Sequence, residues 1–249
     1  MTLRKVTILA VDDDARILRM IQRILELEGY RVIKAINGED ALAAFDEGTP
    51  DLVLLDIMMP GMDGSAVCER IREFSQVPII MVTAKGDETE KVRCLDAGAD
   101  DYVTKPFSSK EFAARIRVAL RHTTLWDERS DPKLVFKDME IDFARHKVTL
   151  NGRELDLTAT EHRLLSYLAR NAGRILTPDQ ILGQVWGENY TGETHLLQVN
   201  IARLRRKIKD DVKKPVYIVT RPGIGYMMPE EAPVEVSKVQ VKNREAGLD

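Results

Sequence analysis

The sequence predicts a doubly wound α/β fold with a buried parallel sheet, followed by a smaller α+β domain. Three apolar runs in the first half each lead into a polar residue, and they are Val6–Val11, Asp51–Asp56 and Val77–Thr83. Such runs are typical of strands buried on both faces of a parallel sheet. Helical patterns lie between them through residue 122, as a doubly wound sheet requires. From Lys133 the pattern changes to short alternating segments, which favour an antiparallel sheet.

The helices of the first half follow from their apolar spacing. Residues 15–28 place an apolar stripe on one face, and Gly29 then favours a helix end. The stripe consists of Ile17, Leu18, Ile21, Ile24 and Leu25. The last helix of this half is expected over Lys110–His122, with Phe112, Ile116 and Leu120 turned inward.

The second half combines hairpins with helices. Residues 134–158 alternate and contain Asn151-Gly152, a strong signal for a hairpin turn. A second hairpin is expected around Pro222-Gly223. Thr177 followed by Pro178 is a favourable N-terminal cap with proline at the first helical position. The helices are expected over Thr158–Asn171, Thr177–Trp186 and Glu193–Lys209.

These patterns divide the chain into four parts, and its length suits two domains. The first domain is expected over residues 1–122 and the second over residues 133–229. Residues 123–132 lose periodicity and end in Asp-Pro, so we expect a linker there. Residues 230–249 are charged and lack periodic apolar residues, so we expect a disordered tail.

The composition excludes several classes of protein. Hydrophobic residues make up 44% and charged residues 31% of the chain, which is ordinary for a soluble globular protein. No apolar run approaches the ~20 residues of a membrane span, and the N-terminus is interpreted as a first strand, so we expect a cytoplasmic protein. Cys68 and Cys94 are the only cysteines, which predicts free thiols rather than a disulfide framework or a structural zinc site.

The net charge of −3 conceals a difference between two regions. Residues 133–229 contain 16 Lys+Arg and 11 Asp+Glu, a net charge of +5, so the remainder carries −8. An acidic region joined to a basic one is typical of a regulator with a nucleic-acid-binding module. A basic face is more often simply solvated, so charge alone does not establish this function.

Polar side chains gather where the predicted strands end. They are Asp12, Asp13, Asp56, Thr83 and Lys105. Because the carboxyl ends of strands in an open α/β sheet form the ligand crevice, these groups should converge. Three close carboxylates repel each other, and a hard cation such as Mg²⁺ relieves that conflict with its oxygen ligands. The alternative is that Asp12–Asp14 only cap the next helix, as Asp14 itself is expected to do.

Residues 1–122 resemble a response-regulator receiver domain. The matching motifs are VDDD at 11–14, LLDIMMPGMDG at 54–64, MVTA at 81–84 and GADDYVTKPF at 98–107. The resemblance implies a flavodoxin-like sheet of five parallel strands. It also implies that Asp56 accepts a phosphoryl group, that Lys105 and Thr83 contact this group, and that Tyr102 turns inward as a switch. The implied Mg²⁺ ligands are Asp12, Asp13, Asp56 and the backbone carbonyl of Met58.

The chemistry of phosphoryl transfer suits these residue types. A carboxylate is a modest nucleophile, and the transfer mainly needs in-line positioning and cations on the equatorial oxygens. Mg²⁺ and Lys105 would supply those cations. Because Lys105 must aim into the pocket and cis bonds are mainly an X-Pro feature, we expect the Lys105-Pro106 peptide bond to be cis.

Two other functions fit parts of this pattern. An aspartate-nucleophile, Mg²⁺-dependent phosphatase would need a second acidic residue two positions after Asp56, where this chain has Met58, so we expect no enzyme. A DNA-binding protein with a vestigial receiver is disfavoured because the set of pocket residues is complete.

Residues 133–229 resemble the winged-helix effector domain of the OmpR/PhoB family. The matching stretches are LTATEHRLLSYLARNAGRILT at 157–177, QVWG at 184–187, VNIARLRRKI at 199–208 and GIGY at 223–226. The third helix has an apolar stripe of Leu197, Ile201, Leu204 and Ile208, so its other faces can enter the major groove of DNA. The expected DNA contacts are His195, Gln198, Arg203, Arg205, Arg206, Lys207 and Arg221.

Among these residues, Gln198 and Arg203 are expected to read bases, while Arg206 and Lys207 are expected to contact phosphates. The alternative is a solvated basic helix end that complements the helix dipole. Two positions depart from the family pattern. Pro222 replaces a common wing arginine, and Ala202 replaces a usual basic residue. Sequence preference therefore cannot be carried over, although the QVWG and TRPGIGY context resembles the Kdp-type branch.

The resemblance also implies partners. A sensor histidine kinase would donate the phosphoryl group, promoter DNA would be the target, and RNA polymerase is a further candidate partner. Phosphorylation would promote a homodimer through exposed charged side chains, whose role is orientation more than affinity. These are Lys91, Asp96, Asp100, Asp101, Glu111, Arg115 and Arg117. The alternative is ordinary salt bridging within one protomer.

Overall fold

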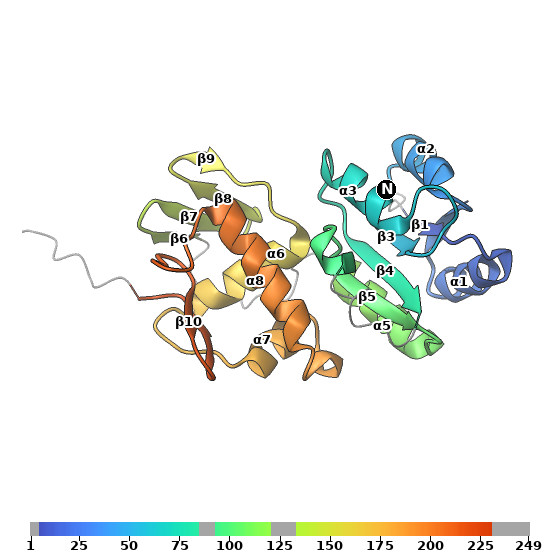
Figure 1. Cartoon of the computed structure of the whole chain (residues 1–249). Coiled ribbons are helices and arrows are strands. Elements are labelled where there is room, and N and C mark those ends of the chain that lie inside the picture. The colour runs from blue at the N-terminus through green and yellow to red at the C-terminus, as the bar shows by residue number, and fades with distance from the viewer. Residues whose placement is uncertain (1–4, 85–92, 121–132, 231–249) are drawn as a thin grey trace, which may run out of the picture.

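The computed structural model describes residues 5–84, 93–120 and 133–230. They form two lobes that lie side by side, one from each half of the chain (Figure 1). The expected linker at 123–132 and nearly all of the expected tail at 230–249 lie outside the described residues, so those boundaries stay predictions. No helix in the described part of the chain is long and apolar enough to cross a membrane.

The first lobe is a parallel five-stranded sheet in the order β2-β1-β3-β4-β5. Its strands are β1 (Thr7–Val11), β2 (Arg31–Ala35), β3 (Leu52–Asp56), β4 (Ile79–Ala84) and β5 (Asp101–Lys105). Its helices include α1 (Ala15–Leu27), α2 (Gly38–Gly48), α3 (Gly64–Arg72) and α5 (Ser109–Leu120). The doubly wound α/β prediction is confirmed.

Helices cover both faces of this sheet, which is why its central strands are apolar throughout. Alternate residues of a strand point to opposite faces. In β1, Ile8 and Ala10 therefore pack with residues of α1 and α5, while Leu9 and Val11 pack on the other face with residues of α2 and α3. Every residue of β1 and β3 is buried. The polar residues that follow these strands therefore emerge at one rim of the sheet.

The second lobe is an α+β domain, as predicted. Its antiparallel sheet contains β6 (Lys133–Phe136), β7 (Met139–Asp142), β8 (Lys147–Leu150) and β9 (Arg153–Glu154). The helices are α6 (Ala159–Arg170), α7 (Pro178–Val185) and α8 (Thr194–Ile208), with a short helical turn η1 (Glu188–Tyr190) before α8. The chain ends its folded part in a hairpin of β10 (Val219–Arg221) and β11 (Gly225–Met227).

Local signals in the sequence account for these boundaries. Thr158 and Thr177 each form a capping box at the start of a helix, and Pro178 takes the first position of α7. Asn151 and Gly152 have φ values of 51° and 73°, the left-handed conformations that a tight hairpin turn requires. The caps fix where α6 and α7 begin, and the turn fixes where β8 ends and β9 begins.

The C-terminal hairpin is tied to the rest of its lobe at Gly225. Backbone hydrogen bonds join Leu176 and Tyr226 in both directions, at 2.8 and 3.0 Å. A Cβ atom on residue 225 would lie only 1.9 Å from the carbonyl oxygen of Leu176, so glycine is required there. The hairpin is thereby held in place relative to α7, whose N-cap follows Leu176.

Candidate functional site

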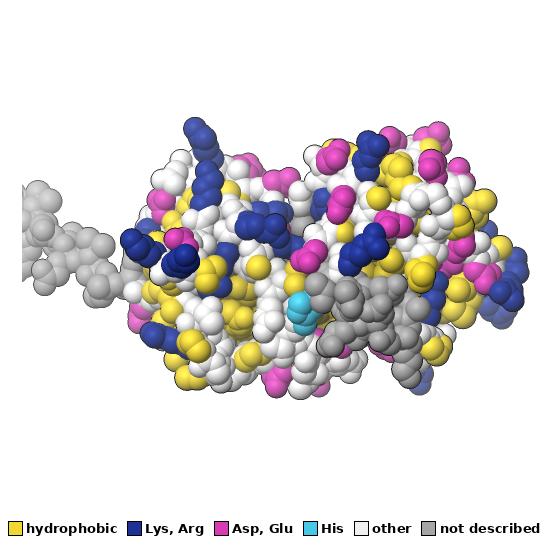
Figure 2. Space-filling model, viewed as in Figure 1, with side chains coloured by type: hydrophobic (Ala, Val, Ile, Leu, Met, Phe, Trp, Pro, Cys, Tyr) yellow, Lys and Arg dark blue, Asp and Glu magenta, His cyan; other side chains and the backbone are white. Residues whose placement is uncertain are grey.

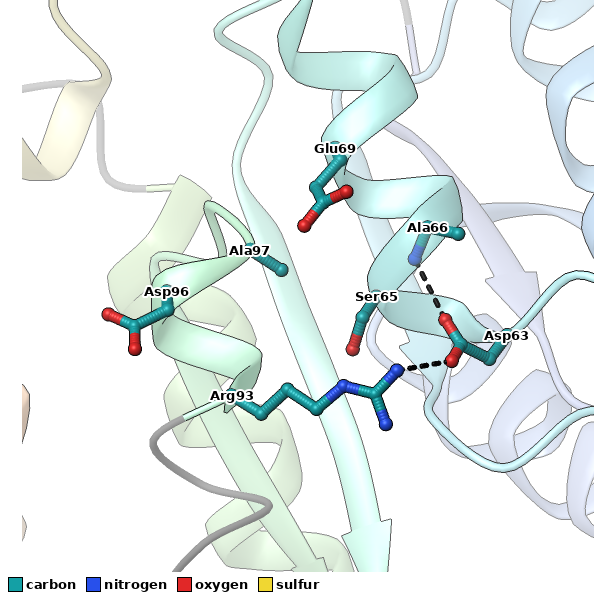
Figure 3. Close-up of a pocket in the computed structure, with 7 residues that line it drawn as sticks. All are labelled: Asp63, Ser65, Ala66, Glu69, Arg93, Asp96 and Ala97. Atoms are coloured by element: carbon teal, nitrogen blue, oxygen red, sulfur yellow. Dashed lines mark hydrogen bonds and ion pairs between the residues drawn. The ribbon is translucent and has the colours of Figure 1, made fainter.

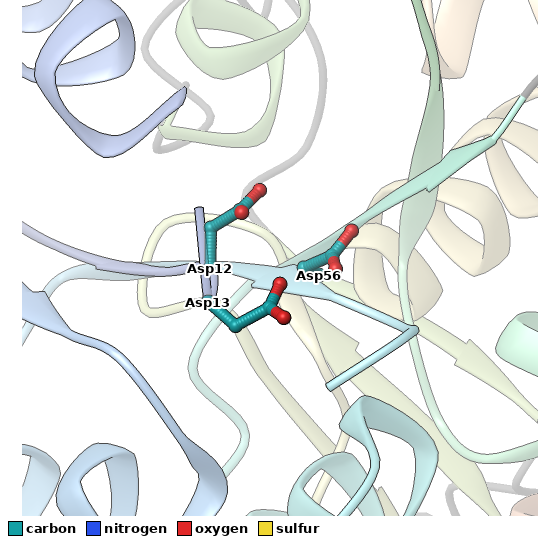
Figure 4. Close-up of side chains that lie close together, drawn as sticks. All are labelled: Asp12, Asp13 and Asp56. Atoms are coloured by element: carbon teal, nitrogen blue, oxygen red, sulfur yellow. The ribbon is translucent and has the colours of Figure 1, made fainter. Parts of the chain in front are cut away.

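Three carboxylates meet at the carboxyl ends of β1 and β3. The two strands are neighbours with Val11 paired to Leu55, so the residues that follow in register are Asp12 and Asp56. One oxygen of each of Asp12, Asp13 and Asp56 lies within 4.8 Å of the others (Figure 4). Asp12 and Asp56 are buried, and Asp13 is exposed. The structure thus brings together the acidic residues that the sequence grouped.

Lys105 reaches this cluster from the end of β5. Its Nζ lies 2.7 Å from an oxygen of Asp12 and 2.7 Å from an oxygen of Asp56. The peptide bond from Lys105 to Pro106 is cis, as predicted. Thr83 is buried in β4, one residue beyond the strand partner of Asp56. These side chains therefore share one rim of the sheet.

Burial and charge oppose each other in this pocket. Burial raises the pKa of Asp56, and the hydrogen bond from Lys105 offsets this only in part. The charges of Asp12 and Asp13 raise it further. For Lys105, burial lowers the pKa, but the bonds to two carboxylates outweigh burial and the pKa is raised. Three carboxylates against one ammonium leave excess negative charge, and this set of hard oxygen donors fits a divalent cation such as Mg²⁺.

The loop after β3 is held close to the pocket by the start of α3. The backbone N–H of Gly64 donates to the carbonyl of Ile57 at 3.0 Å, and Asp63 caps α3 by accepting from the N–H of Ala66 at 2.9 Å. A Cβ on residue 64 would lie 2.1 Å from the carbonyl oxygen of Asp56. Only glycine lets α3 begin here. Met58, the predicted source of a ligand carbonyl, lies in this loop with its side chain exposed.

A hollow of about 420 Å³ lies beside this loop, between α3 and the segment that follows Arg93 (Figure 3). Arg93 already donates to the carboxylate of Asp63 at 2.5 Å. Glu69 and Asp96 line the same hollow. Acidic and basic side chains both line this hollow, so its lining does not indicate a particular class of ligand.

The two lobes touch along a seam (Figure 2). Tyr102, the predicted switch residue, lies in β5 and is 6% exposed. Its hydroxyl donates to Glu193, the residue that precedes α8, at a distance of 2.5 Å. Burial and this bond raise the pKa of Tyr102. Glu193 was expected only as the start of a helix, because no motif or periodicity marks a residue that contacts the other domain.

Two carboxylates predicted to be exposed dimer contacts are buried instead, which corrects that expectation. Asp100 and Asp101 are 3% and 4% exposed. Asp100 pairs with Arg72 at 2.8 Å, and Asp101 pairs with Arg115 at 3.2 Å. The hydroxyl of Tyr190 also donates to Asp101. The reasons differ: Tyr190 of the second lobe covers Asp101, whereas the carboxylate of Asp100 is held inside the first lobe by Arg72 and by the N–H of Ile79 at 3.0 Å.

The remaining predicted dimer residues are less constrained. Asp96 is exposed. Glu111 pairs with Arg115 at 3.1 Å within α5, and Arg117 pairs with Glu28 at 2.7 Å. Lys91 lies outside the described residues. The structure therefore supports the alternative of salt bridges within one protomer for part of this surface.

Helix α8 buries the predicted stripe, but it also buries Arg205. Leu197, Ile201, Leu204 and Ile208 are each at most 2% exposed. Arg205 is 7% exposed, and its Nη2 donates to the carbonyl of Ile218 at 2.6 Å. Arg205 follows Ile201 by four residues and precedes Ile208 by three, so it shares their face. The prediction of a DNA contact at Arg205 is therefore wrong for this structure.

The other predicted DNA contacts fall into two groups. Gln198, Arg206 and Arg221 are exposed, and His195 is half-buried. Gln198 and Arg221 line a hollow of about 310 Å³ between α8 and the C-terminal hairpin.

Arg203 and Lys207 instead face the first lobe. Arg203 donates to the carbonyl of Ala99 at 2.7 Å. Lys207 donates to Glu161 at 2.6 Å and to Gln76 at 3.3 Å. Two cations predicted to contact DNA are thus engaged by protein groups in this arrangement.

Two family models match the chain. Residues 8–117 match the response regulator receiver domain, and residues 152–228 match the C-terminal domain of transcriptional regulatory proteins. The sensory transduction protein RegX3 of Mycobacterium tuberculosis is 44% identical over 89% of this chain and 98% of its own length. A solved structure of a RitR mutant has a TM-score of 0.70 and 26% identity, covering 90% of this chain and 99% of its own.

The fold, the acidic pocket and these matches define a class. The chain belongs to the two-component response regulators of the OmpR/PhoB family, with a receiver domain followed by a transcriptional regulatory domain. The transcriptional regulatory protein KdpE of M. tuberculosis is 43% identical over 88% of this chain and 97% of its own length. The response regulator MtrA of Mycolicibacterium paratuberculosis is 44% identical over 88% and 96%. Identities this close do not single out the Kdp-type branch.

Proposed function

We propose that Asp56 accepts a phosphoryl group from a sensor histidine kinase and that this modification controls binding to promoter DNA. The observation that carries the proposal is the cluster of Asp12, Asp13 and Asp56 within 4.8 Å, with Lys105 at 2.7 Å from Asp56. A carboxylate oxygen of Asp56 would form the new bond to phosphorus while the phosphorus–nitrogen bond to the kinase histidine breaks.

Asp12, Asp13, Asp56 and the carbonyl of Met58 would hold Mg²⁺, which would neutralise charge on the transferred group. Lys105 would bind a phosphoryl oxygen, and the distance of 2.7 Å from its Nζ to Asp56 supports this role. Thr83 would donate its hydroxyl to another phosphoryl oxygen. Tyr102 would turn inward behind Thr83, which requires its bond to Glu193 to break.

The DNA-binding surface would be α8 together with the C-terminal hairpin. Gln198 and Arg203 would read base edges, while Arg206, Lys207, His195 and Arg221 would mostly position the helix on phosphates. Gln198 and Arg221 are exposed and line one hollow between α8 and the hairpin, and Arg206 is also exposed, which supports the proposal. Arg205 is not included, because it is buried against Ile218.

Phosphorylation would also favour a homodimer through the charged side chains of β5 and α5. Two DNA-binding domains would then meet half-sites about one helical turn apart. RNA polymerase is the candidate partner at such a promoter. Phosphoryl transfer and DNA binding would both take place in the cytoplasm.

The phosphoacceptor can be tested with acetyl phosphate as donor, using phosphate-affinity gels with and without Mg²⁺. Wild type should shift only with the metal, and Asp56→Asn should not shift. Asp46→Asn, an exposed carboxylate on α2, is the matched control and should shift like wild type. Equal labelling of Asp56→Asn and wild type would refute the assignment. Sustained turnover of p-nitrophenyl phosphate by the same protein would instead establish a phosphatase.

A further inference from the structure

The chain turns back sharply at the C-terminal end of α8, towards the hairpin of β10 and β11. Lys209 takes a left-handed conformation with φ of 55°. The N–H of Asp210 then donates to the carbonyl of Arg205 at 2.9 Å, and the N–H of Lys209 donates to the carbonyl of Arg206 at 3.3 Å. These two bonds form a Schellman motif, which satisfies carbonyls in the last turn of the helix. The turn brings the carboxylate of Asp210 to the segment that enters β10.

The carboxylate of Asp210 binds three successive N–H groups of that entering segment. Asp210 is buried, and its two oxygens accept from three donors. The donors are the N–H groups of Val216 at 2.6 Å, Tyr217 at 3.1 Å and Ile218 at 2.8 Å. Hydrogen bonds to an ionised acceptor are roughly twice as strong as those between neutral groups. Three of them at one buried carboxylate therefore fix the backbone just ahead of β10.

Arg205 binds the same segment from its other side. Its Nη2 donates to the carbonyl of Ile218 at 2.6 Å and to Oγ1 of Thr220, a residue of β10, at 2.9 Å. Ile218 is fully buried. Its N–H meets the carboxylate of Asp210 and its carbonyl meets the guanidinium of Arg205, so two opposite charges hold one residue. We call the side chains of Arg205 and Asp210 the clamp.

The clamp attaches the hairpin directly to α8. The backbone bonds between Leu176 and Tyr226 attach β11 elsewhere, to the segment before α7. Gln198 on α8 and Arg221 on β10 line the same hollow of about 310 Å³ between these two elements. Groups on separate elements can bind one rigid partner together only if they are held within about 0.5 Å of the required geometry. The clamp is the attachment that sets the distance between Gln198 and Arg221.

We infer that Arg205 and Asp210 are positioning residues for DNA binding, which fix the hairpin relative to α8 so that Gln198 and Arg221 reach one duplex together. The inference rests on the proposed function, because it takes Gln198 and Arg221 as DNA contacts. Neither side chain of the clamp touches DNA in this role. Arg205 thus contributes to DNA binding without a phosphate contact, and Asp210 favours DNA binding although its charge repels DNA.

The direction of the change in Asp210→Asn tests the inference. Removing a negative charge should tighten DNA binding if charge alone matters. Loss of the clamp should instead weaken binding of a mixed-sequence duplex of about 40 base pairs, by about tenfold. The control Asp211→Asn removes the same charge at the next, exposed position and should bind at least as tightly as wild type. Tighter binding by Asp210→Asn, equal to that of the control, would overturn the inference.

A double-mutant cycle tests the positioning role of Arg205. Arg205→Met keeps the long apolar stem and removes the donors. In wild type, Arg221→Ala should weaken binding of the same duplex about tenfold. In the Arg205→Met protein it should weaken binding less than about twofold, because the hairpin is no longer held at the duplex. Arg205→Lys keeps a charged donor, should restore part of the Arg221 effect, and replaces Arg205→Met if methionine prevents folding. Additive losses would show that Arg205 acts independently of the hairpin and would overturn the inference.

Amide hydrogen exchange distinguishes failure of the clamp from failure of the proposed function. Without DNA, β10 and β11 should exchange about tenfold faster in Arg205→Met and in Asp210→Asn than in wild type, while β7 and β8 should not change. Unchanged exchange of the hairpin in variants that melt cooperatively would also refute the clamp. Faster exchange in the variants, together with no DNA binding by wild type, would refute the proposed DNA-binding surface and leave the clamp established.

Discussion

The acidic pocket around Asp56 and the seam between the lobes each bury a carboxylate beside a cation, but the polar partners of the carboxylate differ between the two sites. In the pocket, Lys105 faces a group of three carboxylates that lie within 4.8 Å of each other. At the seam, Asp101 accepts from Arg115, from Tyr190 and from the N–H of the next residue. The pocket retains unbalanced negative charge, whereas the seam carboxylate is fully supplied with donors.

The balance of charge distinguishes a ligand site from a contact that must be displaced. Buried polar groups are normally paired, so an excess of one charge points to a missing partner. A balanced cluster needs no ligand, and it can act only by being opened. The pocket should therefore respond to added cations and phosphoryl donors, while the seam should respond to competitors for its surface.

The largest expected effect on stability comes from a substitution at Gly64, where the backbone shapes the pocket. In Gly64→Ala, the new Cβ would lie 2.1 Å from the carbonyl oxygen of Asp56, so the loop or α3 must move. We expect a loss of about 3–4 kcal/mol in unfolding free energy and impaired labelling of Asp56. Urea unfolding of the full-length protein measures the first effect.

The matched control for this substitution is Gly183→Ala in α7. No atom lies within 4 Å of a Cβ placed there, so alanine should be neutral or stabilise by up to about 1 kcal/mol. Equal stability of Gly64→Ala and wild type would show that the loop after β3 adapts without strain. The shape of the pocket would then depend little on the backbone conformation at Gly64.

His162 provides a third environment, a buried ionisable group with no counter-charge. Burial lowers its pKa to about 4, and the charges of His146 and Arg163 act in the same direction. Well above pH 6.5, His162 is unprotonated in both the folded and the unfolded protein. As pH falls from 6.5 towards 4, the unfolded chain takes up a proton that the folded one refuses, so stability should fall by about 3 kcal/mol. Urea unfolding at pH 7, 6 and 5 would show this decline.

His162→Gln should flatten that decline, whereas His195→Gln on α8 should retain it. If both variants kept the wild-type pH profile, groups other than His162 would control the acid sensitivity. His162 could then not serve as the uncharged buried group with which the carboxylates of the pocket and the seam are compared.

The pocket was predictable from sequence and the seam was not, for a physical reason. Asp12, Asp56 and Lys105 are far apart in the chain, but each follows or ends a strand, and parallel strands place those ends at one rim. Tyr190 ends the short helical turn η1 and Glu193 precedes α8, so no periodic pattern of apolar residues marks either side chain as a contact. Their contact depends on the fit between two surfaces that are far apart in the chain. The residue pattern of one surface does not predict the shape or the charges of the other.

Arg205 shows a second limit of pattern-based reasoning. A periodic analysis assigns arginine to the exposed face, yet the long stem of this side chain packs inside while its head bonds to a backbone carbonyl. Its position between Ile201 and Ile208 was the available signal. In contrast, the capping boxes at Thr158 and Thr177 were predictable, because a cap depends on residues only three positions apart.

Removing the ammonium group of Lys105 should affect the labelling of Asp56 differently from removing the guanidinium group of Arg115. Lys105→Gln should slow labelling of Asp56 by acetyl phosphate about a hundredfold, as expected for the loss of one positioned charge. Lys34→Gln, an exposed lysine in β2, should have no effect. Arg115→Gln at the seam should not slow labelling. Equal losses for Lys105→Gln and Arg115→Gln would erase the distinction between the two sites.

The smallest expected effect is the response of the seam to pH. Burial raises the pKa of Asp101 to about 6, and the opposing effects of Arg115 and Tyr190 do not cancel it. A carboxyl whose pKa is raised while the lobes touch binds a proton more readily then than when the lobes are apart. The contact between the lobes should therefore strengthen as pH falls through 6, by at most about 1 kcal/mol between pH 7 and 5.5. Small-angle scattering should show a smaller radius of gyration at the lower pH in wild type and no such change in Asp101→Asn. A wild-type protein that expands as the pH falls would reverse the sign of this linkage and place the dominant proton uptake in the form with separated lobes.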